Sequence, residues 1–360
     1  MINLSAEEIE RRINILKTQT FYLGPSYYPE KKSKSDQERF NDLVEQIKTY
    51  GWPDFQYLQY GMDVKTPEEC AKYVNAMEFV YRRNYLNFES KSFDTECCIL
   101  RNKLFFDIFA KGIGIKTPTI EYFYTENVLY DMHDGFKPFS FSELVKMEKS
   151  YFCKDLNGEC GNGIFILIVK EGQFVIDDKI VSEEDLLAII TGKQYIFQTM
   201  LVQHAEMSRL YPNSINSIRL VTVRSMKDNK IHVLPSILRM GANGSFVDNT
   251  SQGGIACGFD ILTGQLNETG LYKPQFGRLT SEHPNSKVRF SEFKIPFIDK
   301  AISQATFFHS MLKNIHSIGW DIAIGPEDPI FIEGNDDWEI TGPQSCNRGL
   351  RKEFEEYFFE

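Results

Sequence analysis

The sequence predicts an α+β protein, in which a mostly helical N-terminal region (residues 1–95) is followed by antiparallel strands. Three observations support this prediction. Helix-start signals recur in the first part of the chain, and short apolar runs separated by glycine-containing turns follow them. Near the C-terminus, two further apolar runs flank a Gly/Pro/Asp turn, which is the composition of a β-hairpin.

The N-terminal region contains two recognisable helix starts. In Ser5–Glu8 and in Thr66–Glu69 a serine or threonine precedes a glutamate by three residues, which is the pattern of a capping box. Pro67 occupies the first helical position of the second helix. The Pro-, Lys- and Ser-rich segment 22–37 predicts a loop. The sequence leaves open whether this region forms an acceptor pocket or the interface of a homodimer.

The rest of the chain alternates between strands and a few helices. A helix over 99–110 is expected to end at Gly112 and Gly114, and an antiparallel meander follows it. Glycine-rich loops are expected between the hairpin that follows the meander and the long helix after Pro296. The expected strands are 120–124, 151–154, 164–169, 174–176, 195–198, 217–224 and 231–238, and the remaining helices begin at Ser182, after Pro296 and at Arg351.

The hairpin over residues 320–335 predicts a divalent-metal site. If its strands pair across the turn, Asp321 lies opposite Glu333, and Asn335 lies on the same face because side chains alternate along a strand. Two carboxylates roughly 5 Å apart repel each other unless a cation lies between them or one is protonated. Carboxylate and amide oxygens are hard ligands that suit Mg²⁺. From these residues alone, an ordinary solvated acidic surface remains the equal alternative.

A glycine-rich loop over residues 154–164 joins two expected strands, and Lys154 lies on the strand that enters it. Glycines let several backbone N–H groups point at one anion, and a lysine adds a point charge for phosphate oxygens. The loop is not a P-loop, which needs Gly-Lys-Ser/Thr and a following helix. Taken alone, it is more often an ordinary hairpin turn. Lys103, on the preceding helix, is a second candidate cation, with surface solvation as its alternative.

Two arginines lie on apolar strands. Arg219 alternates with Val221 and Val223, and Arg239 follows an Ile-Leu pair. Each arginine needs an anionic partner, because burying a lone charge costs several kcal/mol. The sequence is equally compatible with an anionic substrate or phosphate and with an internal carboxylate as that partner.

The composition, with 42% hydrophobic and 25% charged residues, is that of an ordinary soluble globular protein. The net charge of −10 argues against a general nucleic-acid surface, which needs basic patches. We expect no membrane span and no signal peptide, because the sequence shows neither apolar pattern. The seven cysteines form no zinc-type pairs or disulfide frame, which predicts a reducing, cytoplasmic environment.

The order of these features resembles the ATP-grasp superfamily, which includes D-alanine–D-alanine ligase, biotin carboxylase and glutathione synthetase. The sequence is more specifically similar to the sugar-transfer-associated ATP-grasp family, which is associated with surface polysaccharide biosynthesis. That similarity covers roughly residues 95–350 and leaves the region before them unmatched. The runs that carry it are Ser214–Arg219, Val247–Asn249 with Gly253–Ile255, and Gly319–Asp321 with Phe331–Asn335.

The resemblance implies an ATP-grasp fold, in which two antiparallel-sheet lobes clasp a nucleotide after the helical N-terminal region. The small lobe would span residues 96–205 and carry the glycine flap, and the large lobe would span 206–360 and carry the metal site. The implied cofactors are ATP and Mg²⁺. The implied site residues are Lys103 and Lys154 for the phosphates, Gly158, Gly161 and Gly163 in the flap, Gln198, Met200, Val202 and Gln203 in the adenine hinge, Asp321, Glu333 and Asn335 for the metal, and Arg219 and Arg239 for the transferring phosphoryl group.

The implied activity is that of an ATP-dependent carboxylate–amine ligase that acts through an acyl phosphate on small molecules such as a sugar acid and an amino acid. Two alternatives remain open, namely a phosphotransferase with the same fold and a non-catalytic nucleotide-binding partner of a glycosyltransferase. Two departures from the family pattern would alter substrate choice or weaken the nucleotide site. Glu159 and Cys160 stand where the flap usually carries small residues, and the bulky run Asp336–Glu339 replaces a small turn.

Overall fold

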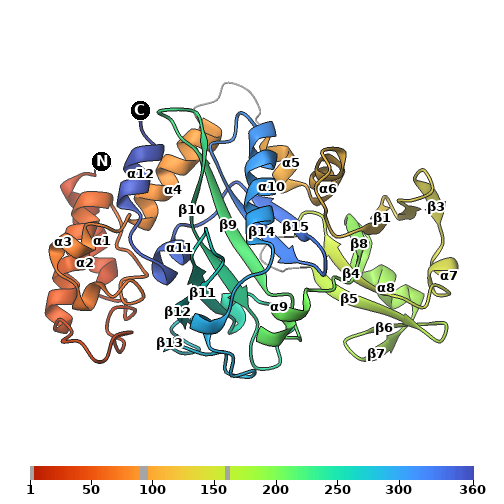
Figure 1. Ribbon diagram of the computed structural model, residues 1–360, viewed down its shortest axis with the longest axis horizontal. Coiled ribbons are helices and arrows are strands. Elements are labelled where there is room, and N and C mark those ends of the chain that lie inside the picture. The colour runs from red at the N-terminus through yellow and green to blue at the C-terminus, as the bar shows by residue number, and fades with distance from the viewer. Residues whose placement is uncertain (1–3, 90–95, 159–162) are drawn as a thin grey trace. The chain divides into compact units, whose positions relative to one another are not determined.

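The computed structural model describes residues 4–89, 96–158 and 163–360. By its contacts the chain divides into two units (Figure 1). Unit 1 comprises Met1–Cys97, Gln203–Pro329 and Gly334–Glu360, and unit 2 comprises Cys98–Val202 and Ile330–Glu333. The N-terminal region thus groups with most of the C-terminal part of the chain. Whether residues 1–95, 96–205 and 206–360 act as separate functional parts stays a prediction.

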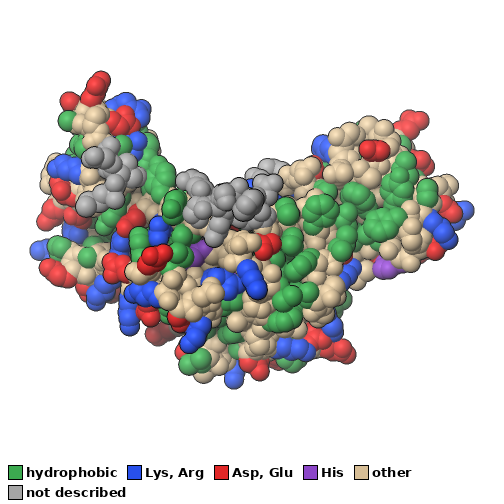
Figure 2. Space-filling view, turned by 90° about the horizontal axis from the view of Figure 1, so that it is seen from above, with side chains coloured by type: hydrophobic (Ala, Val, Ile, Leu, Met, Phe, Trp, Pro, Cys, Tyr) green, Lys and Arg blue, Asp and Glu red, His purple; other side chains and the backbone are tan. Residues whose placement is uncertain are grey.

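Charges of both signs are mixed on the face that Figure 2 shows, where Lys and Arg side chains are interspersed with Asp and Glu. Within the described ranges, none of the helices combines the length and the apolar character needed to cross a membrane. The cysteines that the structure describes form no disulfide.

The N-terminal region is helical. Thr66 forms the expected capping box, because its Oγ1 accepts from Glu69 N at 3.3 Å and its own N–H donates to the Glu69 carboxylate at 2.9 Å. Ser5 accepts from Glu8 N at 3.2 Å. The elements are α1 (Ala6–Leu16), α2 (Asp36–Tyr50), the 3₁₀ turn η1 (Met62–Val64), α3 (Pro67–Cys70), α4 (Ala76–Asn84) and the π-helical turn η2 (Tyr85–Glu89).

Unit 2 is built on an antiparallel sheet of eight described strands in the order β3-β2-β1-β8-β4-β5-β6-β7. The short strands β2, β3 and β7 lie outside the segments that the sequence predicts as strands. The strands are β1 (Ile120–Thr125), β2 (Val128–Asp131), β3 (Lys137–Phe139), β4 (Ser150–Asp155), β5 (Ile164–Lys170), β6 (Gln173–Ile176), β7 (Lys179–Val181) and β8 (Tyr195–Thr199).

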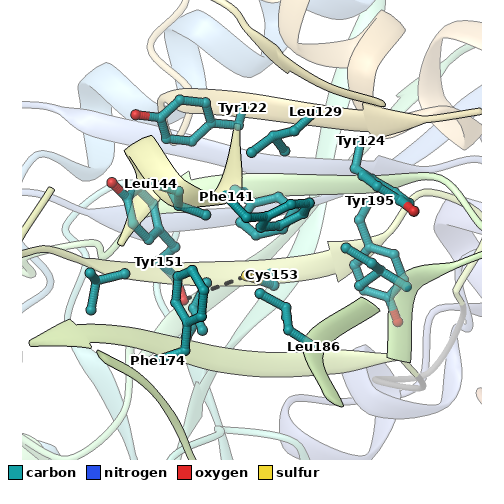
Figure 3. Close-up of a cluster of buried hydrophobic side chains, with 14 of the residues drawn as sticks. Tyr122, Tyr124, Leu129, Phe141, Leu144, Tyr151, Cys153, Phe174, Leu186 and Tyr195 are labelled. Carbon is teal, nitrogen blue, oxygen red and sulfur yellow. Dashed lines mark hydrogen bonds between the residues drawn. The ribbon is translucent and has the colours of Figure 1, made fainter. Parts of the chain in front are cut away.

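An aromatic core covers one face of this sheet (Figure 3). Tyr122 and Tyr124 point to the same side because they are two residues apart on β1. They pack with Phe141 of α7 (Phe141–Leu144), Leu186 of α8 (Glu183–Ile190) and Tyr151 of β4. The opposite face has a smaller core, in which Leu104 of α6 (Lys103–Gly112) packs among residues of β1 and β8.

Most of the second sheet belongs to unit 1, whereas Ile330–Glu333 of its last strand group with unit 2. This sheet is also antiparallel in its paired strands and has the order β13-β12-β11-β10-β9-β14-β15 over the described residues. The predicted hairpins are confirmed, but β11 to β13 occupy a segment that was expected to be glycine-rich loops. The strands are β9 (Ser217–Arg224), β10 (Ile231–Met240), β11 (Ile255–Phe259), β12 (Leu266–Leu271), β13 (Leu279–Thr280), β14 (Ser317–Ile324) and β15 (Pro329–Asn335).

Helices cover both faces of this sheet. The long helix α10 (Ile298–Met311) packs on β9, β10 and β14. On the other face, α11 (Thr341–Cys346) packs on β10, β11 and β12, and the N-terminal helices share an apolar core with the sheet. The remaining elements are α5 (Cys97–Arg101), α9 (Ala205–Leu210), η3 (Thr250–Gln252), η4 (Phe290–Glu292) and α12 (Arg351–Tyr357).

A buried relay of hydrogen bonds fixes β14 between β9 and α10. Trp320 Nε1 donates to Thr222 Oγ1 at 2.8 Å, and Thr222 Oγ1 lies 2.8 Å from His309 Nδ1. His309 Nε2 lies 3.0 Å from Ile315 O. Every donor in this network finds an acceptor when the Thr222 hydroxyl donates to His309 Nδ1 and His309 Nε2 donates to the Ile315 carbonyl. The network therefore assigns a neutral imidazole to His309.

We expect this histidine to make the fold sensitive to acid. Burial lowers the pKa of His309 to about 3, against about 6.5 in an unfolded chain. Between these values the unfolded chain binds a proton that the folded chain does not, so stability is lost as the pH falls from about 6.5 towards 3. The contribution amounts to about 2 kcal/mol between pH 7 and pH 5.

Urea unfolding of the wild type and of His309→Gln at both pH values checks this expectation. The difference in unfolding free energy between the two proteins should shrink by about 2 kcal/mol at pH 5. The same pH dependence in both proteins would show that His309 is not the titrating group.

Candidate functional site

Four polar side chains share one face of the sheet in unit 1. Arg219 on β9 lies directly opposite Asp321 on β14, and Ser217 on β9 lies directly opposite Arg239 on β10. Ser217 and Arg219 are two residues apart, so their side chains project to the same side. Three neighbouring strands therefore bring together two arginines and one carboxylate that are far apart in sequence.

The Asp321 carboxylate pairs with both arginines. Arg219 binds it with two nitrogens, because Nε donates to Oδ1 at 2.6 Å and Nη2 donates to Oδ2 at 3.1 Å. Arg239 Nη2 lies 2.8 Å from Oδ2. Asp321 is only 4% exposed, whereas the arginine side chains are 18% and 20% exposed. The internal carboxylate, one of the two partners compatible with the sequence, is thus the partner in this structure.

The two arginines also determine the charge of Asp321. Burial by itself would raise the pKa of this carboxyl group, but the guanidinium groups outweigh burial and hold the pKa well below its usual range. Asp321 is therefore ionised at neutral pH. Asp321, Arg219 and Arg239 therefore form a charged site. The arginines could bind an anion there, and the carboxylate could bind a cation.

Asp248 and Ser217, which are not among the residues predicted for the site, extend this charged site. Asp248 Oδ2 accepts from Ser217 N at 3.0 Å and from the Ser217 hydroxyl, and it lies 3.9 Å from Arg239 Nε. Both residues occur in the runs that resemble the family. That occurrence was the available signal, but only the tertiary structure shows that both residues meet Arg239.

The residues expected to hold a metal fit Mg²⁺ by their chemistry. Asp321 is ionised, Glu333 is a second carboxylate, and Asn335 can offer an amide oxygen, all of them hard donors. Asn335 Nδ2 donates to Gly319 O at 3.3 Å, so its oxygen is the atom directed away from that carbonyl. No three His, Cys, Asp or Glu side chains of the described ranges form a metal site, but the expected triad contains only two residues of those types. The convergence of Asp321, Glu333 and Asn335 stays a prediction.

In unit 2, Lys103 lies at the base of the glycine loop. The sequence predicts one helix over 99–110, but the structure has two, because Asn102 accepts from Leu104 N and Phe105 N at 3.0 Å and caps a new helix. Lys103 is the first residue of that helix, α6. Its ammonium donates to Leu156 O at 3.1 Å and Gly158 O at 2.8 Å. The lysine therefore contacts the stem of the expected flap.

The other residues expected to bind the phosphates are Lys154, on the strand that enters this loop, and the glycines of the loop itself. Lys154 lies on β4 with its ammonium 5.2 Å above the Phe152 ring. Gly163, at the far end of the loop, has a φ of +71° and stands so close to Asp155 that a Cβ would lie 2.8 Å from the Asp155 Cβ. Of the remaining flap residues, Gly161, Glu159 and Cys160 lie outside the described residues.

The expected hinge follows strand β8. Gln198 is buried within that strand, whereas Met200 and Val202 lie beyond its end with side chains 41% and 69% exposed. Gln203 has a structural role: Nε2 donates to Tyr211 O and Ser214 O, and Oε1 accepts from the N and Nδ2 of Asn216. The Gln203 side chain is thus fully used inside unit 1.

Two residues of the bulky run after Asn335, Asp336 and Trp338, are buried in unit 1. Trp338 is 1% exposed, its Nε1 donates to Ser317 Oγ at 3.1 Å, and its ring meets Phe79 of α4 edge-on with centroids 4.7 Å apart. Arg83 donates to Asp337 O and Trp338 O. This departure from the family pattern therefore attaches the N-terminal region to the strand that carries Asp321.

The buried side-chain amide of Asn87 also connects the N-terminal region to strand β14. Asn87 Oδ1 accepts from the backbone N–H groups of His316 and Ser317, and Asn87 Nδ2 donates to Ser317 O and Asp336 O. All four hydrogen-bonding positions of this side chain are then satisfied. The start of β14 and the segment after β15 are thus held by one residue of η2.

Comparisons with known proteins come from solved structures and from family models, since no curated protein matches the chain. The chain is similar to N5-carboxyaminoimidazole ribonucleotide synthetase from Thermus thermophilus, with 15% identity over 66% of this chain and 45% of that chain and a TM-score of 0.35. It is also similar to D-alanine–D-alanine ligase from Bacillus anthracis complexed with ATP, with 12% identity over 66% and 55% of the chains and a TM-score of 0.34. D-alanyl-alanine synthetase A from Vibrio cholerae gives 12% identity over 72% and 62% and a TM-score of 0.40.

These similarities are distant, and the matched region spans about half the length of the first two enzymes. They therefore say nothing about the activity of this chain. The family model is more specific, because the model described as sugar-transfer associated ATP-grasp matches residues 83–357, well over half of the chain. The chain therefore belongs to the sugar-transfer associated ATP-grasp family.

Proposed function

We propose that this protein is an ATP- and Mg²⁺-dependent ligase that joins a small-molecule carboxylate to an amine through an acyl phosphate. Its place would be in the biosynthesis of surface polysaccharides or other sugar conjugates. The observation that carries the proposal is the pairing of the ionised Asp321 with Arg219 and Arg239 on one face of a sheet in a member of this family. Two distantly similar solved structures contain a nucleotide. One is a D-alanine–D-alanine ligase complexed with ATP, and the other is an ADP complex of N5-carboxyaminoimidazole ribonucleotide synthetase.

In this proposal, the basic side chains would bind the phosphates and the carboxylate, and the acidic side chains would bind Mg²⁺. Lys103 and Lys154 would hold the phosphates of ATP, and the backbone from Met200 to Gln203 would bind the adenine edge. Asp321, Glu333 and Asn335 would hold Mg²⁺, which would neutralise part of the triphosphate charge when bound. Arg219 and Arg239 would bind the substrate carboxylate or the transferring phosphoryl group, because guanidinium groups match the geometry of both anions.

The reaction would proceed in two steps. A carboxylate oxygen of the first substrate attacks the γ-phosphorus, the bond to the bridging oxygen breaks, and ADP leaves. The amine of the second substrate then attacks the acyl carbon, the bond from carbon to the phosphate oxygen breaks, and an amide, phosphate and a proton are formed. No side-chain nucleophile is needed. The protein would contribute by positioning the groups and by stabilising charge.

A second candidate function is that of a non-catalytic nucleotide-binding partner of a glycosyltransferase. The two departures from the family pattern favour it, because Glu159 and Cys160 stand where the flap usually carries small residues and Asp336–Glu339 replaces a small turn. Both departures would weaken a catalytic nucleotide site.

The decisive experiment measures ADP and phosphate release with Mg-ATP against a panel of uronic acids and amino acids. The proposal predicts release of both products only when an acid and an amine are present together. Formation of AMP and pyrophosphate would exclude the proposal, and a stable phosphorylated product without free phosphate would identify a phosphotransferase. Binding of Mg-ATP without turnover for any pair would favour the non-catalytic partner.

A further inference from the structure

A chain of polar contacts links Asp321 to a loop without an assigned role. Arg239 Nη2 contacts Asp321, and Arg239 also donates from Nε and Nη2 to Ser217 Oγ at 3.2 and 2.9 Å. The Ser217 hydroxyl in turn donates to Asp248, which also accepts the Ser217 N–H. Since a hydroxyl has one proton and two lone pairs, this arrangement uses the Ser217 hydroxyl completely.

The loop from Gly241 to Gly254 places Asp248 next to Ser217, the first residue of strand β9. At Gly254 a Cβ would lie 2.6 Å from Asp248 O and 2.9 Å from Met240 O, so only glycine allows the backbone to pass at this distance. On the other side, Tyr211 Oη donates to Ser245 O at 3.0 Å. The position of Asp248 is thus fixed by its own loop as well as by Ser217.

We propose that Asp248 is a positioning residue, which acts through Ser217 to hold the Arg239 guanidinium in the orientation that binds the anionic substrate. The inference rests on the proposed function, in which Arg239 binds the substrate carboxylate or the transferring phosphoryl group. Asp321 contacts one terminal nitrogen of Arg239, and this contact by itself does not fix the plane of the guanidinium group. The two contacts with Ser217 fix the plane of the group, and Asp248 provides a counter-charge that stays in place whatever Asp321 binds.

A double-mutant cycle in the full chain separates this role from a purely structural one. The variants are Asp248→Asn, Arg239→Ala and the two combined, and the readouts are kcat, KM for the carboxylate, KM for ATP and the melting temperature. Asp248→Asn should lower kcat/KM for the carboxylate by about 10-fold, which is the usual cost of losing an orienting partner, with KM for ATP changed by less than about 2-fold. In the Arg239→Ala background the same substitution should cost nothing further, because its effect passes through Arg239.

Asp260→Asn is the matched control. Its carboxylate also accepts from a hydroxyl and N–H groups in a turn, at Thr263 Oγ1, Thr263 N and Leu262 N. It contacts no arginine in the described part of the chain, so this variant should keep wild-type kinetics. If Asp248→Asn lowers turnover equally with and without Arg239, or only lowers the melting temperature, the positioning role is overturned.

A second measurement keeps failure of this inference distinct from failure of the proposed function. Orthophosphate binding in the presence of Mg-ADP, followed by calorimetry, should weaken by about 10-fold in both Asp248→Asn and Arg239→Ala and no further in the double variant. A wild type that turns over no substrate pair and binds no orthophosphate would overturn the proposed function. A wild type that does either, with additive effects of the two substitutions, would overturn the inference about Asp248 alone.

Discussion

Asp321→Asn should both destabilise the fold and remove turnover. The substitution keeps the size of the side chain but leaves Arg219 and Arg239 without the carboxylate that they share. Removing one partner of a buried ion pair leaves uncompensated charge, and because the arginines are partly exposed we expect a loss of about 3 kcal/mol in the free energy of unfolding. ADP release should fall by roughly 100-fold or more, since the same change alters the proposed metal ligand and disorders both arginines.

Urea unfolding and ADP release, measured on the same preparation, check both effects. Asp228→Asn is a suitable control, because Asp228 is an exposed carboxylate in the turn between β9 and β10 and lies 3.5 Å from His232. It should leave both the unfolding free energy and turnover close to those of the wild type. Wild-type stability of Asp321→Asn would mean that the arginines do not depend on this carboxylate.

Trp338→Ala should be at least as destabilising. Trp338 is fully buried, and its ring packs on Phe79. The Trp338 Cβ lies so close to β14 that a Cβ added at Gly319 would be 2.6 Å from it. Truncating a buried aromatic side chain of this size typically costs about 3 to 5 kcal/mol. Because Trp338 joins the N-terminal region to β14, Mg-ATP affinity should weaken together with stability.

Trp338→Phe provides the matched comparison. Phenylalanine keeps an aromatic ring against Phe79 but loses the hydrogen bond from Nε1 to Ser317 Oγ, so we expect a loss of about 1 kcal/mol beyond the change in volume. Chemical unfolding measures the stability, and titration with Mg-ATP measures the nucleotide affinity. An alanine variant that unfolds like the wild type would show that this residue does not connect the N-terminal region to the site strand.

The elements of the fold were largely predictable because their signals are local. The capping box at Thr66, the strands β4, β5 and β9, and the acidic hairpin each follow from neighbouring residues and their spacing. The errors have local causes too. Asn102 was overlooked as the cap that divides one expected helix into α5 and α6, and β11 to β13 are short strands whose glycines and polar residues suggested loops.

Some residues of the charged site could be named from the sequence, but their contacts could not. The family resemblance singled out Asp321, Arg219 and Arg239, and it is confirmed by the match to residues 83–357. It did not show that the aspartate binds both arginines or that Ser217 and Asp248 complete the group. Nor did it show that Asp336 and Trp338, in the run Asp336–Glu339, are buried in unit 1.

The sequence by itself therefore determined the α+β class and the residue types that suit phosphate and magnesium, because turn chemistry and motif spacing are properties of short segments. Its resemblance to a known family indicated the family. The tertiary structure decided which charges meet. Asp321 and Arg219 are about a hundred residues apart and become neighbours only through the register of β9 and β14. Pairing between distant strands depends on the packing of the whole sheet, and no local pattern specifies it.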